Sequence, residues 1–236
     1  MRASLGEYRL IYGMRTFVGA VLFAMSLTAS PKDVSFPTID SGVVHAAVYG
    51  SGDRSVVLAH GARFNKESWE KQATALAAAG FRVVAIDFRG YGKSRGGADS
   101  KNAHEEMYVD VLAAVRYLRE SGAKTVGVVG GSMGGGAAAN AVVKGRPGEI
   151  DRLVLIAHAP IQEPQRITGP KLFLVSEGDP IAPRVREQFN SAPEPKELVV
   201  LGGSAHAQNL FATQEGERLM AEILRFLKSD AAAGAP

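Results

Sequence analysis

Short apolar runs alternate with longer stretches of helical composition along most of the chain. The apolar runs predict strands over Val43–Tyr49, Ser55–His60, Arg82–Phe88, Thr125–Val129, Leu153–Ala157, Lys171–Ser176 and Glu197–Leu201. The stretches between and after them predict helices over Glu67–Ala79, Asn102–Glu120, Ala137–Val143, Arg184–Phe189 and Glu215–Leu227. Strands and helices that alternate in this rhythm predict an α/β fold, with a mostly parallel central sheet and helices on both faces.

The first two predicted strands differ from the rest because a short turn joins them. Gly50-Ser51-Gly52-Asp53 is a turn signal between two β-rich runs, and it predicts a hairpin. The segment 31–42 before the first predicted strand is interpreted as a linker, and residues 230–236 as a flexible tail.

Five polar residues lie at or just after the C-terminal ends of the predicted strands. They are His60, Asp87, Ser132, His158 and Asp179. Since ligands of a parallel sheet bind beyond the carboxyl ends of its strands, these side chains are expected to gather along one edge.

The segment Val126–Gly136 carries the strongest chemical signal. It reads Val-Gly-Val-Val-Gly-Gly-Ser-Met-Gly-Gly-Gly, which places Ser132 between glycines at a strand-to-helix junction. At such a sharp turn, side chains at positions 130 and 134 would collide with neighbouring backbone, and the helix that follows would point its N–H groups at a developing oxyanion. A glycine turn that only allows close helix packing is the plainer alternative. A phosphate loop is disfavoured because neither Gly-Lys-Ser/Thr nor GxGxxG is present.

Five motifs in a fixed order extend this signal. His60-Gly61, Asp87-Phe88-Arg89-Gly90-Tyr91-Gly92-Lys93-Ser94, the Ser132 segment, Gly178-Asp179 and Gly202-Gly203-Ser204-Ala205-His206 each follow a predicted strand. Over residues 43–229 the chain resembles the α/β-hydrolase superfamily, in which the serine, the acid and the histidine occur in this order.

The resemblance implies a role for each motif. Ser132 would be the nucleophile, His206 the general base and then acid, and Asp179 the carboxylate that orients the histidine. The backbone N–H groups of Met133 and Ala62 would form the oxyanion hole. No metal and no organic cofactor is required for this chemistry.

Several residues compete for these roles. Glu177 lies close to Asp179, but the superfamily places the acid after the glycine. The remaining histidines are His45, His104 and His158. The resemblance implies that His60 and Asp87 are structural residues that hold loops in place and do not react.

Three residues are candidates for substrate binding. Arg63 and Phe64 lie beside the predicted oxyanion hole, where Arg63 could grip a substrate carboxylate or be a solvated surface arginine. His158 precedes the acid in the chain, the wrong order for the triad, but can line the pocket.

A departure from many family members predicts an open site. Only His158–Pro170 separates two predicted strands at the place where a helical cap is often inserted, too few residues for a cap domain. The pocket is therefore expected to be shallow, which suits hydrolysis better than acyl transfer. The candidate lids are Arg63–Trp69 and Arg95–Asn102.

Composition narrows the remaining classes. The chain has 236 residues, 46% hydrophobic and 22% charged, values typical of one globular domain. It has no cysteine, which excludes disulfides, thiolate metal sites and a cysteine nucleophile. No cluster of lysine and arginine indicates a nucleic-acid partner.

Residues 1–30 resemble a targeting segment. Three arginines and one glutamate lie in them, and the apolar stretch Phe17–Leu27 leads into the small residues Thr28, Ala29 and Ser30. Export to the periplasm or medium is expected, with Met1 or Met14 as the start and cleavage between about Ser26 and Lys32. An uncleaved membrane anchor is the alternative, as is a buried N-terminal helix.

The sequence thus predicts a small, capless serine hydrolase that cleaves a carboxylic ester of a small or accessible substrate through an acyl-enzyme. A thioesterase, an amidase or peptidase, and an enzyme like dienelactone hydrolase share the same residues. A binding module that keeps the fold without catalysis is a further alternative, although it would not require an intact triad.

Overall fold

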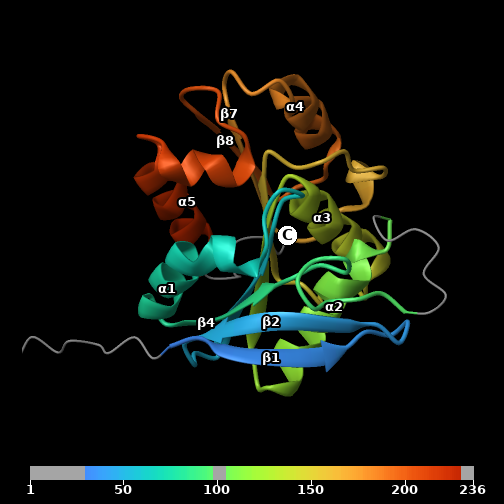
Figure 1. The fold of residues 1–236 in the computed structure, drawn as a ribbon. Helices are drawn as coiled ribbons and strands as arrows, with labels where there is room; N and C mark the ends of the chain where they lie inside the picture. Colours follow the sequence, from blue (N-terminus) through green and yellow to red (C-terminus); the bar gives the residue numbers. More distant parts are fainter. Residues whose placement is uncertain (1–29, 98–104, 230–236) are drawn as a thin grey trace, which may run out of the picture.

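An eight-stranded sheet runs through the centre of the protein (Figure 1). The computed structural model describes residues 30–97 and 105–229. The sheet order is β1-β2-β4-β3-β5-β6-β7-β8. The strands are β1 Lys32–Pro37, β2 Val43–Tyr49, β3 Arg54–Ala59, β4 Phe81–Ile86, β5 Thr125–Gly131, β6 Arg152–Ile156, β7 Lys171–Ser176 and β8 Lys196–Leu201.

Strands β3 to β8 are parallel, and β1 and β2 add an antiparallel edge. The chain moves outward from β3 to β4 and then returns to the other side of β3 as β5. This reversal is a topological switch point, where the loops that leave two neighbouring strands diverge and open a site between them. The loop after β3 and the turn after β5 meet there, because Ala59 is paired with Gly130.

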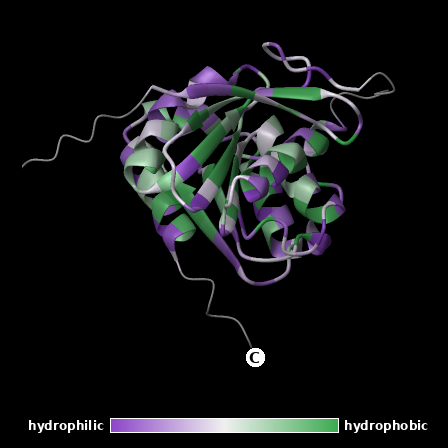
Figure 2. Cartoon of the chain, turned by 90° about the horizontal axis from the view of Figure 1, so that it is seen from below, coloured by the Kyte–Doolittle hydropathy of each residue, from purple (hydrophilic) through white to green (hydrophobic). Residues whose placement is uncertain are grey.

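Helices cover both faces of the sheet (Figure 1). Helices α1 Glu70–Ala78 and α5 Gly216–Lys228 pack on one face, and α2 Met107–Glu120, α3 Met133–Lys144 and α4 Ala182–Ser191 on the other. Successive strand residues alternate between the two cores, so Val57 packs with α2 and α3 while Val56 packs with α1. Figure 2 shows the hydrophobic strands enclosed between the two helical layers. The predicted fold class is confirmed.

Two expectations for the first strands were wrong. Residues 32–37, predicted to lie in a linker, form β1 on the sheet edge. The expected hairpin is not formed, since β4 separates β2 from β3. The turn does reverse the chain, but its glycines have a packing role: a Cβ on Gly50 would lie 2.4 Å from the carbonyl oxygen of Phe81, and one on Gly52 would lie 2.0 Å from that of Gly80. The start of β4 therefore lies against the turn.

Several expectations concern residues that lie wholly or partly outside the described ones. They are the leader 1–30, all but residue 30 of which is outside, the tail 230–236, the segment Arg95–Asn102, of which only residues 95–97 are described, the start of the helix predicted over Asn102–Glu120, and His104. Within residues 30–97 and 105–229, no helix has the length and apolar character needed to cross a membrane.

A buried ion pair ties the loop after β4 to helix α2. The Arg89 side chain is 1% exposed and the Asp110 side chain 0%, and Arg89 Nη2 lies 2.8 Å from Asp110 Oδ1. The Arg89 backbone N–H also donates to Asp110 Oδ2, at 2.8 Å. On the outer side the guanidinium reaches Asp40 and Glu106. The hydrogen bonds with Arg89 and Thr38 outweigh partial burial and lower the pKa of Asp40 to about 2.

Removal of the Asp110 charge should therefore be costly. The Asp110→Asn variant leaves a buried guanidinium with reduced compensation, and we expect it to lower the free energy of unfolding by about 3 kcal/mol in urea denaturation. The matched control is Glu163→Gln, which removes the exposed partner of Arg166 and should cost less than about 1 kcal/mol. Equal effects of the two variants would contradict this account.

Candidate active site

Ser132 lies in a strained backbone conformation at the junction of β5 and α3. Its φ is 50° and its ψ is −116°, a region that residues with a side chain seldom adopt. Hydrogen bonds hold the peptide groups on either side: Ser132 N–H donates to the Ile156 carbonyl at 2.9 Å, and Ala159 N–H donates to the Ser132 carbonyl at 2.8 Å. The turn thus presents the Ser132 side chain at the edge of the sheet.

Close approach of backbone explains the flanking glycines. A Cβ on Gly130 would lie 2.4 Å from the carbonyl oxygen of Gly134, and one on Gly134 would lie 2.2 Å from that of Ala59. Both contacts are with backbone, which cannot move aside locally. The crowding predicted for these two positions is present.

The structure brings Ser132, His206 and Asp179 together. Ser132 Oγ is 2.9 Å from His206 Nε2, and His206 Nδ1 is 2.8 Å from Asp179 Oδ2. In neutral His206 the Nδ1–H donates to the carboxylate, which leaves Nε2 as the acceptor of the serine proton. The Asp179 side chain is 1% exposed and that of His206 is 41% exposed, so the acid is buried and the base lies at the rim.

Contacts between the loops after β7 and β8 set this geometry. Gly178 N–H donates to the Gly203 carbonyl at 2.8 Å, and the Ser176 hydroxyl donates to the Ala205 carbonyl. Asp179 Oδ1 accepts the N–H of Ile181 at 3.1 Å, which fixes the carboxylate plane. Glu177 is exposed, and Asp179 is the acid that faces His206.

Of the two predicted oxyanion donors, Met133 directly follows Ser132, and Ala62 follows Gly61, on which a Cβ would lie 3.4 Å from the Ser132 Cβ. The Gly135 and Gly136 N–H groups bond to the Ser132 carbonyl, whereas the Met133 N–H at the start of α3 donates to no acceptor among the described residues. The Ala62 N–H likewise has no acceptor within the described part of the chain. Both donors are therefore available to a ligand at Ser132.

His60 and Asp87 hold the loops around the site. Phe88 N–H donates to His60 Nε2 at 3.2 Å, so His60 carries its proton on Nδ1 and donates it to the Gly61 carbonyl at 2.8 Å. Burial lowers the pKa of His60, which favours this neutral form. Asp87 accepts the Lys66 N–H at 2.8 Å and pairs with Lys66 Nζ at 3.0 Å.

Three residues were predicted to contact a substrate, and for His158 this prediction was wrong. Its side chain is fully buried behind α3, where its Cβ would lie 2.7 Å from a Cβ on Gly135. Its Nδ1 bonds to the Ala159 carbonyl, and its Nε2 has no partner among the described residues. His158 does follow a strand, as the other polar candidates do, but it is not exposed because helix α3 covers this strand end. Arg63 is exposed and Phe64 is half-buried, and their contact with a substrate remains a prediction.

Two residues of the site were not predicted. Tyr91 Oη donates to the Ala62 carbonyl at 2.9 Å, and Gln208 Oε1 accepts the Gly61 N–H at 2.7 Å. Tyr91 lies in the Asp87–Ser94 motif, but nothing in that motif indicates a contact with the loop after β3. Gln208 carried no sequence signal beyond its place two residues after His206.

The segment between β6 and β7, where a cap could be inserted, is short. Between β6 and β7 the described residues contain only the 3-10 turn η2 Pro164–Arg166 and no cap domain. The candidate lid Arg63–Trp69 contains the 3-10 helix η1 Lys66–Trp69, which Asn65 caps through the Ser68 N–H.

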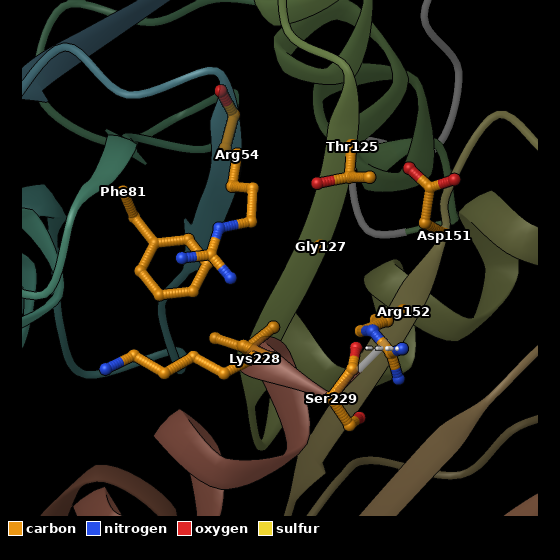
Figure 3. A pocket seen from close by; sticks show the side chains of 10 residues that line it. Arg54, Phe81, Thr125, Gly127, Asp151, Arg152, Lys228 and Ser229 are labelled. Carbon is orange, nitrogen blue, oxygen red and sulfur yellow. Dashed lines mark hydrogen bonds between the residues drawn. The ribbon is translucent and has the colours of Figure 1, made fainter. Parts of the chain in front are cut away.

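A separate cavity of about 100 Å³ lies at the opposite ends of the strands, where β3 to β6 begin (Figure 3). There the Arg54 guanidinium stacks on the Phe81 ring, and Arg152 donates to the Ser229 carbonyl. Since the triad lies at the carboxyl ends of the strands, this cavity takes no part in its chemistry.

Comparisons with known proteins agree with this geometry. Residues 54–166 match the model of the alpha/beta hydrolase fold family. The chain is 44% identical to bifunctional epoxide hydrolase 2 of Rattus norvegicus over 73 residues, which are 30% of this chain and 13% of that protein. It is 34% identical to a non-heme haloperoxidase of Rhodococcus erythropolis over 114 residues, 48% of this chain and 39% of that protein. The chain therefore spans well under half the length of these two curated relatives.

Solved structures extend the likeness to most of the chain. An esterase of Pyrococcus furiosus superposes with a TM-score of 0.72 at 21% identity, over 84% of this chain and 92% of that one. An esterase of Exiguobacterium antarcticum gives a TM-score of 0.69 at 17% identity, over 84% of this chain and all of that one.

The strand order, the strained serine turn and the assembled Ser-His-Asp set define an α/β-hydrolase fold with a serine at the nucleophile position. These features agree with the match of residues 54–166 to the alpha/beta hydrolase fold family.

The buried His158 should make stability depend on pH. Burial lowers its pKa to about 4, whereas an unfolded histidine titrates near 6.5. The unfolded chain then binds more protons between these values, so this contribution is complete above about pH 6.5 and is lost as the pH falls toward 4. In urea titrations, His158→Leu should lower the slope of unfolding free energy against pH in this window, by up to about 1.4 kcal/mol per pH unit.

His60, whose pKa is also lowered, contributes in the same direction and should keep part of the slope in that variant. An unchanged slope in His158→Leu would show that His158 is not held neutral by the fold.

Proposed function

We propose that the protein is a serine hydrolase that cleaves a carboxylic ester. The observation that carries the proposal is the line of hydrogen-bonding atoms from Asp179 through His206 to Ser132 Oγ, with each heavy-atom distance below 3 Å. A serine hydroxyl becomes a nucleophile when an oriented base can remove its proton. A binding module would not need all three groups in this alignment.

The first half of the reaction forms an acyl-enzyme. Ser132 Oγ attacks the ester carbonyl carbon as its proton passes to His206 Nε2. The N–H groups of Ala62 and Met133 stabilise the negative charge that develops on the carbonyl oxygen. His206 then gives the proton to the alkoxide oxygen as the carbon–oxygen bond breaks, and the alcohol leaves.

The second half restores the enzyme. His206 removes a proton from water, and the hydroxide attacks the acyl carbon. The new tetrahedral intermediate breaks down when Ser132 Oγ leaves and regains its proton from His206, which releases the carboxylic acid. Asp179 remains ionised and stabilises the imidazolium in both halves.

The openness of the site favours an accessible ester as substrate. The half-exposed His206 is reached by water without movement of a cap, which suits hydrolysis of the acyl-enzyme. Esterases appear among the structural neighbours, and this agreement supports the choice of an ester. Thioesters and amides would use the same atoms, and Arg63 and Phe64 are the candidate contacts for substrate selection.

A covalent probe tests the proposal directly. We expect a fluorophosphonate to add once to the purified protein, by intact mass, and to leave Ser132→Ala unmodified. His206→Ala should react far more slowly because the serine proton has no acceptor. For an activated ester such as p-nitrophenyl acetate, Asp179→Asn should lower kcat by about 10⁴-fold, since the histidine tautomer is lost.

Ser51→Ala is the matched control, because Ser51 is an exposed serine between two glycines in the turn before β3. It should label and turn over like the parent. If the folded parent forms no adduct and hydrolyses no ester or thioester, the enzyme proposal fails and ligand binding at the cleft becomes the better hypothesis.

We also propose export, on the basis of the arginines and the apolar stretch in residues 1–30. Expression of the full chain in a Gram-negative host should yield a periplasmic or secreted form whose N-terminus lies between about Ser26 and Lys32. Leu22→Arg, which interrupts the apolar stretch, should keep the protein in the cytoplasm. A parent that stays in the membrane fraction would indicate the anchor instead.

A further inference from the structure

The loop that carries the Ala62 N–H is held at three consecutive peptide groups. The Gly61 N–H donates to Gln208 Oε1 at 2.7 Å. The Gly61 carbonyl accepts from His60 Nδ1 at 2.8 Å and from the Phe64 N–H at 3.0 Å. The Ala62 carbonyl accepts from Tyr91 Oη at 2.9 Å. Each contact fixes one peptide plane.

These planes determine where the Ala62 N–H points. The Gly61 carbonyl and the Ala62 N–H belong to one planar trans peptide unit, in which the two bonds point in opposite directions. Rotation of that unit is coupled to the unit before it, whose N–H is held by Gln208. We therefore expect loss of the Gln208 contact to loosen the unit before Ala62 and, through it, to change the direction of the Ala62 N–H.

Gln208 reaches this loop from the segment that also carries the catalytic base. It lies on the 3-10 helix η3 Ala207–Ala212, two residues after His206, and is 7% exposed. Ala207 between them has a φ of 48°, a conformation that turns the chain sharply back toward the site. The Gln208 side chain packs beside the nucleophile strand, since its Cγ lies 3.4 Å from the place of a Cβ on Gly131.

Both ends of the Gln208 amide are paired, which assigns its orientation. Its Nε2 donates to Ser68 Oγ at 2.7 Å, while the Ser68 hydroxyl donates to the Asn65 carbonyl. A backbone N–H can only donate, so the atom that faces Gly61 must be the oxygen. The amide thus links the His206 segment to the loop after β3 and to η1.

We propose that Gln208 is a positioning residue. Its buried amide holds the loop that carries the Ala62 N–H, the proposed oxyanion donor, in a fixed position relative to His206, the proposed base. This inference rests on the proposed serine hydrolase function. Gln208 itself does not touch the reacting atoms. Loss of an oxyanion donor lowers kcat by about 10² to 10³-fold. A donor whose N–H is misdirected should lower kcat by a smaller factor.

The test compares two buried glutamines that make similar contacts. Gln208→Met keeps the side-chain volume but removes the acceptor of the Gly61 N–H, and kcat for p-nitrophenyl acetate should fall about 10- to 100-fold with KM within about twofold. Gln188 forms an analogous pair with the Ile161 N–H and carbonyl outside the site. Gln188→Met should keep kcat within about twofold of the parent, at a similar cost in stability.

Rescue and inhibitor binding separate positioning from a general structural role. Gln208→Glu restores an acceptor for the Gly61 N–H, and kcat should return to within about fivefold of the parent above pH 6. A trifluoromethyl ketone, which forms a tetrahedral oxyanion on the serine, should bind Gln208→Met more weakly by the factor lost in kcat/KM. The pH midpoint of kcat should stay where it is in the parent, since the contact between His206 and Asp179 remains.

The outcomes are distinct. If the parent hydrolyses esters and Gln208→Met behaves like Gln188→Met, the role of Gln208 is refuted while the proposed function stands. If the parent neither hydrolyses esters nor forms the ketone adduct, the proposed function itself fails, and this inference with it. Should Gln208→Met not fold, Gln208→Asn gives the same comparison, because its amide is one methylene too short to reach Gly61.

Discussion

The rest of the site depends on the close approach of three backbone segments around Ser132. The first turn of α3 lies so near the end of β3 that a Cβ on Gly134 would sit 2.2 Å from the Ala59 carbonyl oxygen. This contact holds Ser132 at positive φ, which stores strain of the order of 1 to 3 kcal/mol that the surrounding sheet must support. The same contact brings the loop after β3 beside Ser132, because that loop directly continues β3. The strain at Ser132 and the placement of this loop therefore have one structural cause.

Asp179 and His206 are positioned by a second pair of neighbouring strands. In the register of β7 with β8, Ser176 is paired with Leu201, so the loops that follow start level with each other. The hydrogen bonds from Gly178 and Ser176 then fasten one loop to the other. Since Asp179 and His206 are 27 residues apart in the chain, their 2.8 Å contact depends on this register.

Local signals made much of this predictable from the sequence. The Ser132 turn could be recognised because crowding demands glycine at fixed offsets, and Lys171–Ser176 could be placed as a strand because its residues 172–175 are an unbroken apolar run. Strand pairing was less accessible: the Gly50–Asp53 turn has the composition of a hairpin, but the apolar β4 takes the central place and displaces β2 outward. Edge strand β1 was missed because four of its six residues are exposed and its pattern is weak.

The unpredicted contacts within the site have a different origin. His158 follows a strand like the other polar candidates, yet the glycines of α3 let that helix pack directly over it. Gln208 is placed by the unusual backbone of Ala207 and by partners nearly 150 residues away, a relation with no local sequence signature. These contacts are created by the packing of the loops after β3, β5 and β8 against one another, which no local stretch of sequence specifies.

The exposure of the triad bears on the choice between hydrolysis and transfer. Asp179 is buried, and its charge interacts with His206 in a medium that screens it little. His206 is 41% exposed on its other side, so solvent reaches the atom that must activate the second nucleophile. An acyl-enzyme formed here would meet water at the face of the base, where an acyl transferase would require its exclusion.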